Sequence, residues 1–331
     1  MPVVLQIDAP GTYTDLKFRD VPCPQLKNNE VLYTVAAFGL NYGELLYMAN
    51  TYYNTPSYPA RTGQEAAGIV RAVGPDVIKY KIGDRVTSIV QEFPDYCVNG
   101  EFAVTPEDYL MPWPDGYTAQ EACSVWSSAI TAYYAFVELA DVQPGDNVLI
   151  TAASSTSGIG AIQMAKALGA RVIATSRTLE KEAFLRAQGA DDVIASNGID
   201  VGAEIMRTTA DQGVRVVFDT IAGPFVGRYA GGVGGDAKIF LVGALGGELD
   251  IVCSILPLVR TGASITGYSI YNYHRRPDMF GRAKNFIQAA LETKKIIPVI
   301  DRVFEFRQSL EAYAYLKAGV QRGKIVVAVN S

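Results

Sequence analysis

The segment that decides the fold is NVLITAASSTSGIGAIQMAKALGA, residues 147–170. It begins with an apolar run at 147–150, continues through a turn of small residues, and ends in a helical pattern at 161–170 that stops at a glycine. A strand, a small-residue turn and a helix in this order open a dinucleotide-binding fold. The segment therefore predicts a strand and a helix joined by a phosphate-binding turn.

The turn of this segment carries the predicted phosphate contacts. Backbone N–H groups at the start of the helix would face a pyrophosphate, and the helix dipole favours negative charge there. The pattern departs from a clean G-x-G-x-x-G, and small residues at such turns also serve packing alone. The surrounding strand–helix–strand order favours the phosphate-binding interpretation. The residues assigned to this contact are Ser155, Thr156, Ser157, Gly158, Ile159 and Gly160.

The end of the next strand predicts which dinucleotide is bound. A site for NAD has an acidic residue there, which accepts hydrogen bonds from the ribose hydroxyls. This chain has RVIATSRTLEK at 171–181, with Ser176, Arg177 and, about one helical turn on, Lys181. Two cations and a hydroxyl suit a 2′-phosphate, which a carboxylate would repel. Solvated residues at a helix start are the alternative, but the missing acid favours NADPH as the cofactor.

Strands and helices alternate from residue 147 onward. Apolar runs at 171–176, 214–219 and 238–243 alternate with helical patterns such as 180–190. This rhythm predicts a parallel sheet covered by helices on both faces. Before Pro112 the apolar runs are short and separated by Gly, Pro and Asn, which indicates a β-rich region. The fold class is therefore α/β with two domains.

Composition narrows the range of functions. The chain has 331 residues, 49% hydrophobic residues and a net charge of −5, so it has no basic footprint for nucleic acid. No apolar run reaches the roughly 20 residues of a membrane span. The amino terminus lacks the pattern of a secretory signal, which indicates a cytoplasmic protein. Four scattered cysteines and one histidine, His274, favour neither a disulfide framework nor a multi-histidine metal site.

Several motifs together resemble one enzyme superfamily. They are GLNYGELLYMANTYYNTPSYPARTGQEAAGIVRAVG (39–74), KIGDRV (81–86), ITAYYAF (130–136), the segment 144–176 and GKIVVAV (323–329). In this order they resemble the medium-chain dehydrogenase/reductase superfamily, and specifically its zinc-free quinone oxidoreductase (zeta-crystallin-like) branch. The resemblance implies a GroES-like catalytic domain at 1–122 and 268–331 and a Rossmann domain at 123–267.

The resemblance also predicts that the protein binds no metal. Zinc-bearing relatives use a Cys, a His and a second Cys, and the matching positions here hold Asn41, Gln64 and Ser127. None of these is a good zinc ligand beside thiolate and imidazole. Without a Lewis acid, hydride transfer to a ketone is disfavoured, because an alkoxide forms. A conjugated acceptor spreads the charge, so a quinone, an enone or enal, or an enoyl thioester is the expected substrate.

Proton or hydrogen-bond donors are expected near the start of the catalytic domain. By the resemblance, Tyr52 matches a tyrosine donor of enoyl-reductase relatives, with Tyr53 as the reserve, and Asn41 lies on the nicotinamide side. Glu44 matches an acidic position of relatives. Tyrosines in such a loop also serve as core or pocket wall. Tyr52 and Asn41 are the predicted catalytic residues.

Further cofactor contacts rest on position alone. Thr131 matches a position that relatives use toward the nicotinamide, although a packing role is equally open. Residues after strands at the carboxyl edge of the sheet are expected to line the cofactor site. The whole additional set is Asn41, Thr131, Asn197, Gly243, Ala244, Ser269, Tyr271 and Lys324.

The sequence thus predicts an NADPH-dependent, metal-free reductase of conjugated acceptors. Two alternatives remain open, namely an NADPH-binding protein of the same fold with little turnover and an alcohol dehydrogenase-like carbonyl reductase. The uncharged strand GASITGYS, residues 262–269, is expected at one edge of the Rossmann sheet, where it would pair with its own copy. The expected partners are a small-molecule substrate and a second copy of the chain, without nucleic acid or membrane.

Overall fold

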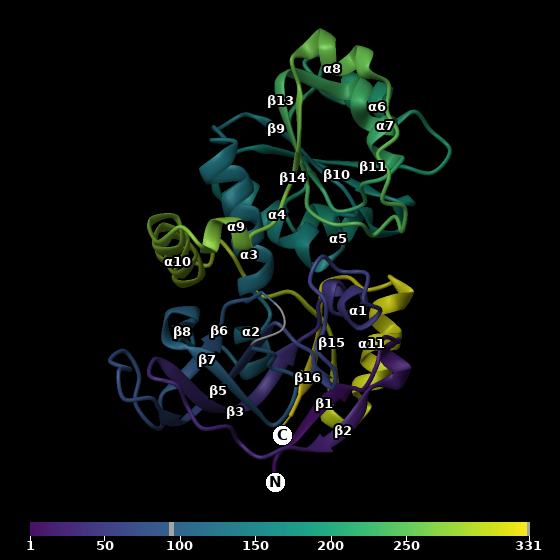
Figure 1. The fold of residues 1–331 in the computed structure, drawn as a ribbon. Coiled ribbons are helices and arrows are strands. Elements are labelled where there is room, and N and C mark those ends of the chain that lie inside the picture. Colours follow the sequence, from purple (N-terminus) through teal and green to yellow (C-terminus); the bar gives the residue numbers. More distant parts are fainter. Residues whose placement is uncertain (93–95, 330–331) are drawn as a thin grey trace. The chain divides into compact units, whose positions relative to one another are not determined.

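The structure is a computed structural model that describes residues 1–92 and 96–329 of the chain (Figure 1). The chain folds into two compact units. The first unit comprises Met1–Ser127 and Pro298–Ser331, and the second comprises Ser128–Ile297. Each unit has its own sheets and its own core.

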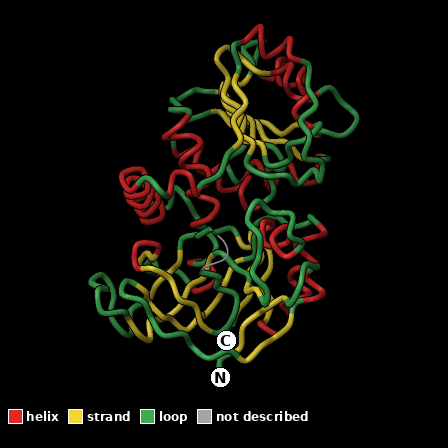
Figure 2. Tube along the Cα trace, in the orientation of Figure 1, coloured by secondary structure: helices red, strands yellow, loops and turns green. Residues whose placement is uncertain are grey.

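The second unit contains a six-stranded sheet in the order β11-β10-β9-β12-β13-β14, and all its strand pairs are parallel. Figure 2 shows helices on both sides of these strands. This is the doubly wound strand order of a dinucleotide-binding domain, so the predicted Rossmann sheet is confirmed. The strands are β9 (Asn147–Ile150), β10 (Arg171–Ser176), β11 (Asp192–Ala195), β12 (Val214–Asp219), β13 (Val233–Leu241) and β14 (Ser264–Gly267).

The helices of this unit follow the predicted pattern of strand and helix. The central strands β9, β10 and β12 are buried along most of their length, because helices lie over both faces of the sheet. The helices are α3 (Trp126–Tyr133), α4 (Thr156–Ala167), α5 (Glu182–Ala187), α6 (Val201–Thr208), α7 (Phe225–Tyr229), α8 (Ile255–Thr261), α9 (Tyr271–His274) and α10 (Pro277–Glu292).

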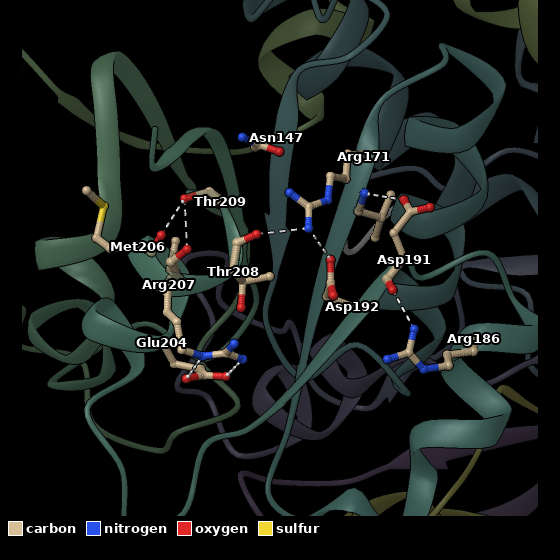
Figure 3. A network of polar contacts seen from close by, with 12 residues as sticks. Asn147, Arg171, Arg186, Asp191, Asp192, Glu204, Met206, Arg207, Thr208 and Thr209 are labelled. Carbon is tan, nitrogen blue, oxygen red and sulfur yellow. Dashed lines mark hydrogen bonds and ion pairs between the residues drawn. The ribbon is translucent and has the colours of Figure 1, made fainter. Parts of the chain in front are cut away.

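Polar contacts tie together the amino ends of the parallel strands (Figure 3). Arg171, the first residue of β10, donates to Asp192 Oδ2 at 2.7 Å and to the Thr208 carbonyl at 2.9 Å. Asn147, the first residue of β9, donates to the Gly213 carbonyl at 3.1 Å. These contacts satisfy side chains and carbonyls within the domain. They leave the opposite, carboxyl edge of the sheet as the one available for a ligand.

The first unit is rich in strands, as predicted. A seven-stranded sheet has the order β15-β16-β3-β5-β6-β8 with β7 paired to β3, and a three-stranded sheet has the order β2-β1-β4. Within the larger sheet every pair except β15·β16 is antiparallel. The strands are β1 (Val3–Ile7), β2 (Lys17–Asp20), β3 (Glu30–Gly39), β4 (Ala60–Arg61), β5 (Glu65–Val73), β6 (Arg85–Ser88), β7 (Phe102–Pro106), β8 (Leu110–Pro112), β15 (Ile300–Glu305) and β16 (Lys324–Ala328).

Three helices complete this unit, and one of them begins where the candidate site lies. The helices are α1 (Tyr42–Met48), α2 (Ala119–Ala122) and α11 (Ser309–Ala318). Tyr47 and Met48 of α1 and Tyr313 of α11 belong to one buried apolar cluster with β3 and β16. The last residues of α1 are thereby anchored in the core of the unit.

The second boundary of the units differs from the expected one. The sequence prediction placed the return to the catalytic domain at residue 268, whereas the structure places it at Pro298. The segment between them contains α9 and α10, which pack within the second unit. Arg282 of α10 donates to Glu138 at 2.8 and 2.9 Å, and the rings of Phe286 and Tyr133 lie 5.2 Å apart. These long-range contacts hold α10 against residues 133–138 and could not be predicted from local sequence.

The helix α10 is the longest in the described part of the chain, with 16 residues, and its sequence is amphipathic. Across residues 1–92 and 96–329 no helix is both long and apolar enough to cross a bilayer.

Candidate active site

The predicted phosphate-binding turn lies between β9 and α4. Ser155 is the N-cap of α4, and its Oγ accepts a hydrogen bond from the Gly158 N–H at 3.1 Å. A Cβ atom at Gly158 would lie 2.6 Å from the Ala153 carbonyl oxygen, and one at Gly160 would lie 2.6 Å from Ser128 Cβ. The two glycines therefore allow the helix to start close to the turn. The Gly158 N–H is bonded within this cap and the Ile159 N–H to the Ser155 carbonyl, so what the turn offers an anion is the positive end of the helix dipole.

The residues predicted to read the 2′-phosphate gather beside this turn. Ser176 ends β10, and Arg177 follows it with an exposed side chain. Lys181 lies further along the chain, and its Nζ donates to Ser154 Oγ of the turn at 3.0 Å. The Asn197 N–H donates to the Arg177 carbonyl at 3.2 Å, so Asn197 joins the same group. The structure thus brings together the turn and two cations at the carboxyl end of β10.

An aspartate that sequence reasoning missed supports the neighbouring part of this edge. Asp219, the last residue of β12, is fully buried, and its Oδ1 accepts from Thr151 Oγ1 at 2.7 Å and from the Ile221 N–H at 2.8 Å. Its Oδ2 accepts from the Tyr229 hydroxyl at 2.8 Å. The sequence signal that could have revealed Asp219 is the strand VRVVFD, residues 214–219, which ends in an acid. Asp219 fixes the backbone after β9 and β12, where the cofactor site is expected.

Gly243 and Ala244 lie in the segment that follows β13. The Leu245 N–H after them donates to the Thr220 carbonyl at 2.9 Å, and a Cβ atom at Gly243 would lie 3.2 Å from the same oxygen. This segment therefore runs directly beside the Asp219 turn at the carboxyl edge of the sheet. The two predicted residues follow the carboxyl end of β13, which is the edge of the sheet where ligands bind in this fold.

Thr131, Ser269 and Tyr271 lie around a cluster of aromatic side chains. The Tyr268 hydroxyl donates to the Thr131 carbonyl at 2.6 Å, which ties α3 to the segment after β14. Tyr271 is buried and packs edge-on against His274, with ring centres 5.9 Å apart. Burial, with Lys284 nearby, lowers the pKa of His274 to about 3. His274 is therefore neutral near pH 7 and part of a packed aromatic cluster.

The first unit gathers three residues singled out from the sequence, Asn41, Ser127 and Lys324, around one buried ion pair. Its carboxylate, Glu65, was missed by sequence reasoning. Lys324, at the start of β16, pairs with Glu65, at the start of β5, and both side chains are only 1% exposed. Lys324 Nζ also donates to Asn41 Oδ1 at 2.9 Å, and Asn41 Nδ2 donates to Glu65 Oε1 at 3.2 Å. The Ser127 N–H donates to Glu65 Oε2 at 3.0 Å, and Ser127 Oγ donates to Asn41 Oδ1 at 3.4 Å. We call Asn41, Glu65, Ser127 and Lys324 the Asn41 cluster.

Tyr52 and Gln64 lie together next to this cluster. A Cβ atom at Gly43, two residues after Asn41, would lie 3.5 Å from Tyr52 Cε2 and 3.7 Å from both Tyr52 Cζ and Gln64 Oε1. The side chains of Tyr52 and Gln64 therefore both lie against the first turn of α1. Tyr52 is half-buried, and its ring packs on that of Tyr53 with centroids 4.3 Å apart. Tyr53 itself is 56% exposed.

Glu44 is held beneath the same turn by donors from three segments. The Asn41 N–H donates to Glu44 Oε1 at 3.0 Å, Asn99 Nδ2 donates to Glu44 Oε2 at 3.1 Å, and the Tyr313 hydroxyl donates to Oε2 as well. The side chain is fully buried. Burial raises the pKa of Glu44 to about 7, although these donors and Lys324 act in the opposite direction. Glu44 fixes the N-terminus of α1, on which Asn41 is the N-cap.

Comparisons with known proteins agree with this arrangement. Residues 27–134 match the family described as alcohol dehydrogenase GroES-like domain, and residues 158–287 match the family described as zinc-binding dehydrogenase. The chain is 27% identical over 294 residues to a quinone oxidoreductase of Sus scrofa, covering 89% of this chain and 87% of the relative. The chain belongs to the medium-chain dehydrogenase/reductase family. The predicted resemblance to its quinone oxidoreductase branch is confirmed.

Three further similar proteins are two solved structures of the same length and one much longer protein. The crystal structure of the CurK enoyl reductase has a TM-score of 0.89 and 25% identity, with 99% of each chain covered. A mycobacterial protein complexed with NADPH has a TM-score of 0.90 and 25% identity, covering 99% of this chain and 100% of that one. Mycoketide-CoA synthase of Mycobacterium tuberculosis is 30% identical over 339 residues, but the chain spans only 8% of its length.

A zinc ion, which this family implies, does not fit the residues present. The three positions that match zinc ligands are Asn41, Gln64 and Ser127, which offer only neutral oxygen and amide groups. Asn41 Oδ1 already accepts from the Lys324 ammonium, so the oxygen that would face a metal is taken by a hydrogen bond. In the described parts of the chain, no three His, Cys, Asp or Glu side chains group as metal ligands. No step of the chemistry below therefore uses a metal.

Proposed function

We propose that the protein is an NADPH-dependent, metal-free reductase that transfers hydride to a conjugated acceptor: a quinone, an enone or enal, or an enoyl thioester. The observation that carries the proposal is the group at the carboxyl end of β10, where Lys181 bonds to Ser154 of the phosphate-binding turn at 3.0 Å and Arg177 is exposed beside it. Two cations next to a phosphate-binding turn suit a 2′-phosphate, and no acid ends this strand.

The cofactor supplies hydride, and the chain supplies binding and charge stabilisation. The amino end of α4 would hold the pyrophosphate, and the residues after β13 and β14 would line the remainder of the cofactor. Hydride addition to the β-carbon of the acceptor places negative charge on the acceptor oxygen. Tyr52 donates a hydrogen bond to that oxygen and Asn41 orients the nicotinamide or holds the same oxygen, as in an oxyanion hole.

The relatives support the class of acceptor but differ within it. The relative from Sus scrofa is a quinone oxidoreductase, and CurK is an enoyl reductase. The mycobacterial structure holds NADPH, which supports the same cofactor here. Both named reactions deliver hydride to a conjugated system whose product charge is delocalised. This shared chemistry, rather than either named substrate, is what we propose for this chain.

A turnover screen with NADPH tests the proposal. Quinones, enones, enals, enoyl thioesters and simple ketones are compared as acceptors at equal concentration, with NADH as the second cofactor. We expect oxidation of NADPH with at least one conjugated acceptor and little with simple ketones. Faster reduction of ketones would favour the carbonyl reductase alternative. Tight NADPH binding without turnover on any acceptor would favour a binding protein of the same fold.

Metal content gives an independent test. Because Asn41, Gln64 and Ser127 stand at the ligand positions and Lys324 is bonded to Asn41, we expect far less than one zinc per chain after dialysis. Elemental analysis of the active protein measures this directly. Near-stoichiometric zinc together with activity that a chelator removes would contradict the metal-free mechanism.

A further inference from the structure

The Asn41 carboxamide is held in one orientation by charged partners. Its Oδ1 accepts from Lys324 Nζ at 2.9 Å and from Ser127 Oγ at 3.4 Å, and its Nδ2 donates to Glu65 Oε1 at 3.2 Å. A rotated carboxamide would direct its N–H groups at an ammonium and its oxygen at a carboxylate, so the rotation is opposed at both ends. A carboxamide has two N–H donors, so one N–H remains beyond the bond to Glu65.

The ion pair behind Asn41 is built into the sheet. Lys324 begins β16, which pairs with β3 so that Val326 lies opposite Gly39. A Cβ atom at Gly39 would lie 2.4 Å from Lys324 Cε and 2.7 Å from the Cys123 carbonyl oxygen, so the glycine leaves the space through which the lysine passes. The Lys324 N–H donates to the Val299 carbonyl at 2.8 Å. The position of the ammonium is therefore set by the backbone.

A buried ion pair of this kind is costly to maintain unless its geometry is good and its hydrogen bonds are satisfied. Both side chains are 1% exposed, and both also bond to Asn41. Apolar or neutral side chains would fill the same space at no greater cost in stability. Packing alone therefore does not explain the ion pair. Its hydrogen bonds with Asn41 indicate a role in orienting that side chain.

We propose that Glu65 and Lys324 are positioning residues that fix the Asn41 carboxamide, so that its remaining N–H is directed at the reacting groups. This rests on the proposed function, in which Asn41 contacts the nicotinamide or the acceptor oxygen. In this family member a lysine ammonium, neutralised by Glu65, binds the Asn41 side chain at the position that a zinc ligand takes in zinc-bearing relatives. It orients the site and supplies no Lewis acid, because its donors are directed at Asn41 and Glu65.

The test is a set of variants that separates positioning from stability. Glu65→Gln and Lys324→Met each leave one buried group without its partner and are expected to destabilise the fold. The double variant Glu65→Gln/Lys324→Met removes both charges at nearly constant volume and should recover most of the melting temperature. The matched control is Lys79→Met/Asp108→Asn, which removes an ion pair with side chains 47% and 62% exposed.

The turnover number distinguishes the outcomes. We expect the double variant to lose about ten- to a hundredfold in kcat, because misplacement of a contacting group by about 1 Å costs this much. In an Asn41→Ala background the same double change should cause no further loss. The control pair should change neither kcat nor melting temperature. Full turnover in the double variant, or a loss that adds to that of Asn41→Ala, would overturn the proposal.

Ser127→Ala keeps the proposal testable if the double variant does not fold. It removes one donor to Asn41 Oδ1 but retains the backbone N–H that bonds to Glu65. We expect about a two- to fivefold loss in kcat, since the ion pair still holds the carboxamide. The loss should disappear in the Asn41→Ala background. An equal loss in both backgrounds would count against positioning.

A measurement without substrate separates this proposal from the proposed function. The two carboxamide protons of Asn41, assigned by NMR through Asn41→Asp, report its orientation directly. We expect two distinct, slowly exchanging signals in the wild type and faster exchange in the double variant. Unchanged signals in the double variant would refute positioning whatever the activity. Absence of turnover in the wild type on every acceptor, with the expected NMR change, would refute the function alone.

Discussion

The two units hold their cations in opposite ways. Lys324 in the first unit is 1% exposed and bonded to Glu65 and Asn41. Arg177 in the second unit is exposed, and Lys181 donates to a neutral hydroxyl, Ser154 Oγ, at 3.0 Å. A buried cation needs a carboxylate within the protein, whereas an exposed one can pair with an anion that arrives with a ligand.

The difference between paired, buried cations and exposed ones predicts two kinds of effect for substitutions. Changes in the first unit, where charges are already paired, should act on turnover or on stability. Changes at the end of β10, where a charge is left for the ligand, should act on cofactor affinity.

Tyr52→Phe should have the largest effect. It keeps the ring and its packing on Tyr53 but removes the hydroxyl that we propose donates to the acceptor oxygen. Loss of one oxyanion donor costs about a hundredfold to a thousandfold in turnover. We expect that loss for enones or enoyl thioesters with NADPH affinity unchanged, and a smaller loss for quinones, whose product is stabilised by aromaticity. Steady-state kinetics on each acceptor measure it.

Tyr53→Phe is the matched control, because its ring contacts that of Tyr52 but its side chain is 56% exposed. It should retain activity. Full activity of Tyr52→Phe on every acceptor would remove Tyr52 from the chemistry, and a loss confined to Tyr53→Phe would transfer the role to its neighbour.

Glu44 gives a prediction for stability against pH. Its pKa is raised to about 7 in the folded protein from an ordinary value of 4.5, so its protonated form is favoured by folding. The stabilisation is complete below about pH 4.5 and is lost as the pH rises through 7. The wild type should therefore lose on the order of 3 kcal/mol of unfolding free energy over this window from this one group. Glu44→Gln should remove that slope in urea unfolding at several pH values.

Glu138→Gln should change the dependence of the unfolding free energy on pH in the opposite direction to Glu44→Gln. The hydrogen bonds from Arg282 lower the pKa of Glu138, despite some desolvation, so its stabilisation is present at neutral pH and lost on acidification. Its removal should therefore cost stability near pH 7 and little at low pH.

One outcome would contradict the prediction for Glu44. If Glu44→Gln has the same pH slope of unfolding free energy as the wild type, then Glu44 is ionised in the folded protein and its donors outweigh burial.

Part of this site could be predicted from sequence and part could not. The turn before α4, the cations after β10 and the edge strand β14 are local patterns, because neighbouring residues determine them. The pairing of Lys324 with Glu65, and of Glu44 with Tyr313, joins residues more than 250 positions apart. No periodicity carries such information. Lys324 was accordingly predicted only as a positional contact to the cofactor, and its buried pairing with Glu65 emerged from the structure.

The boundary between the two units at Pro298 also depends on contacts that local sequence does not reveal. The strand β14 ends at Gly267, and a change of domain directly after the last strand was the simplest expectation. The segment α9–α10 stays with the second unit because of aromatic contacts among Tyr134, Tyr273 and His274, with ring centres 5.2 to 5.7 Å apart. Such contacts depend on tertiary packing and leave no local signal.

Arg177→Ala should have a smaller and more selective effect. A charge-assisted contact is worth about 1.5–3 kcal/mol, so its loss should weaken NADPH binding roughly tenfold or more. NADH lacks the 2′-phosphate, so its affinity should hardly change. Fluorescence titration of both cofactors measures the two constants. Arg186→Ala is the control, because this surface arginine pairs with Glu182 on the same unit. Equal losses for NADPH and NADH would indicate a structural role for Arg177.

At the edge of the second unit's sheet we propose that two copies of the chain pair. The strand β14 has a sheet neighbour, β13, on one side. Near it, α8 and the preceding segment expose Leu249, Val252, Ile255, Leu256 and Val259, each between 62% and 75% exposed.

Clustered exposed apolar side chains beside an open sheet edge favour association with an identical surface. Light scattering should therefore give about twice the 35.7 kDa mass of the chain, and Leu256→Glu/Val259→Glu should shift it toward the monomer. Each exposed side chain that becomes covered on association contributes about 1–3 kcal/mol. Two charges placed among these side chains therefore suffice to disfavour the dimer. Ile78→Glu, an exposed apolar position in the other unit, should leave the mass unchanged. A constant mass of one chain over a wide concentration range would show that this edge stays unpaired.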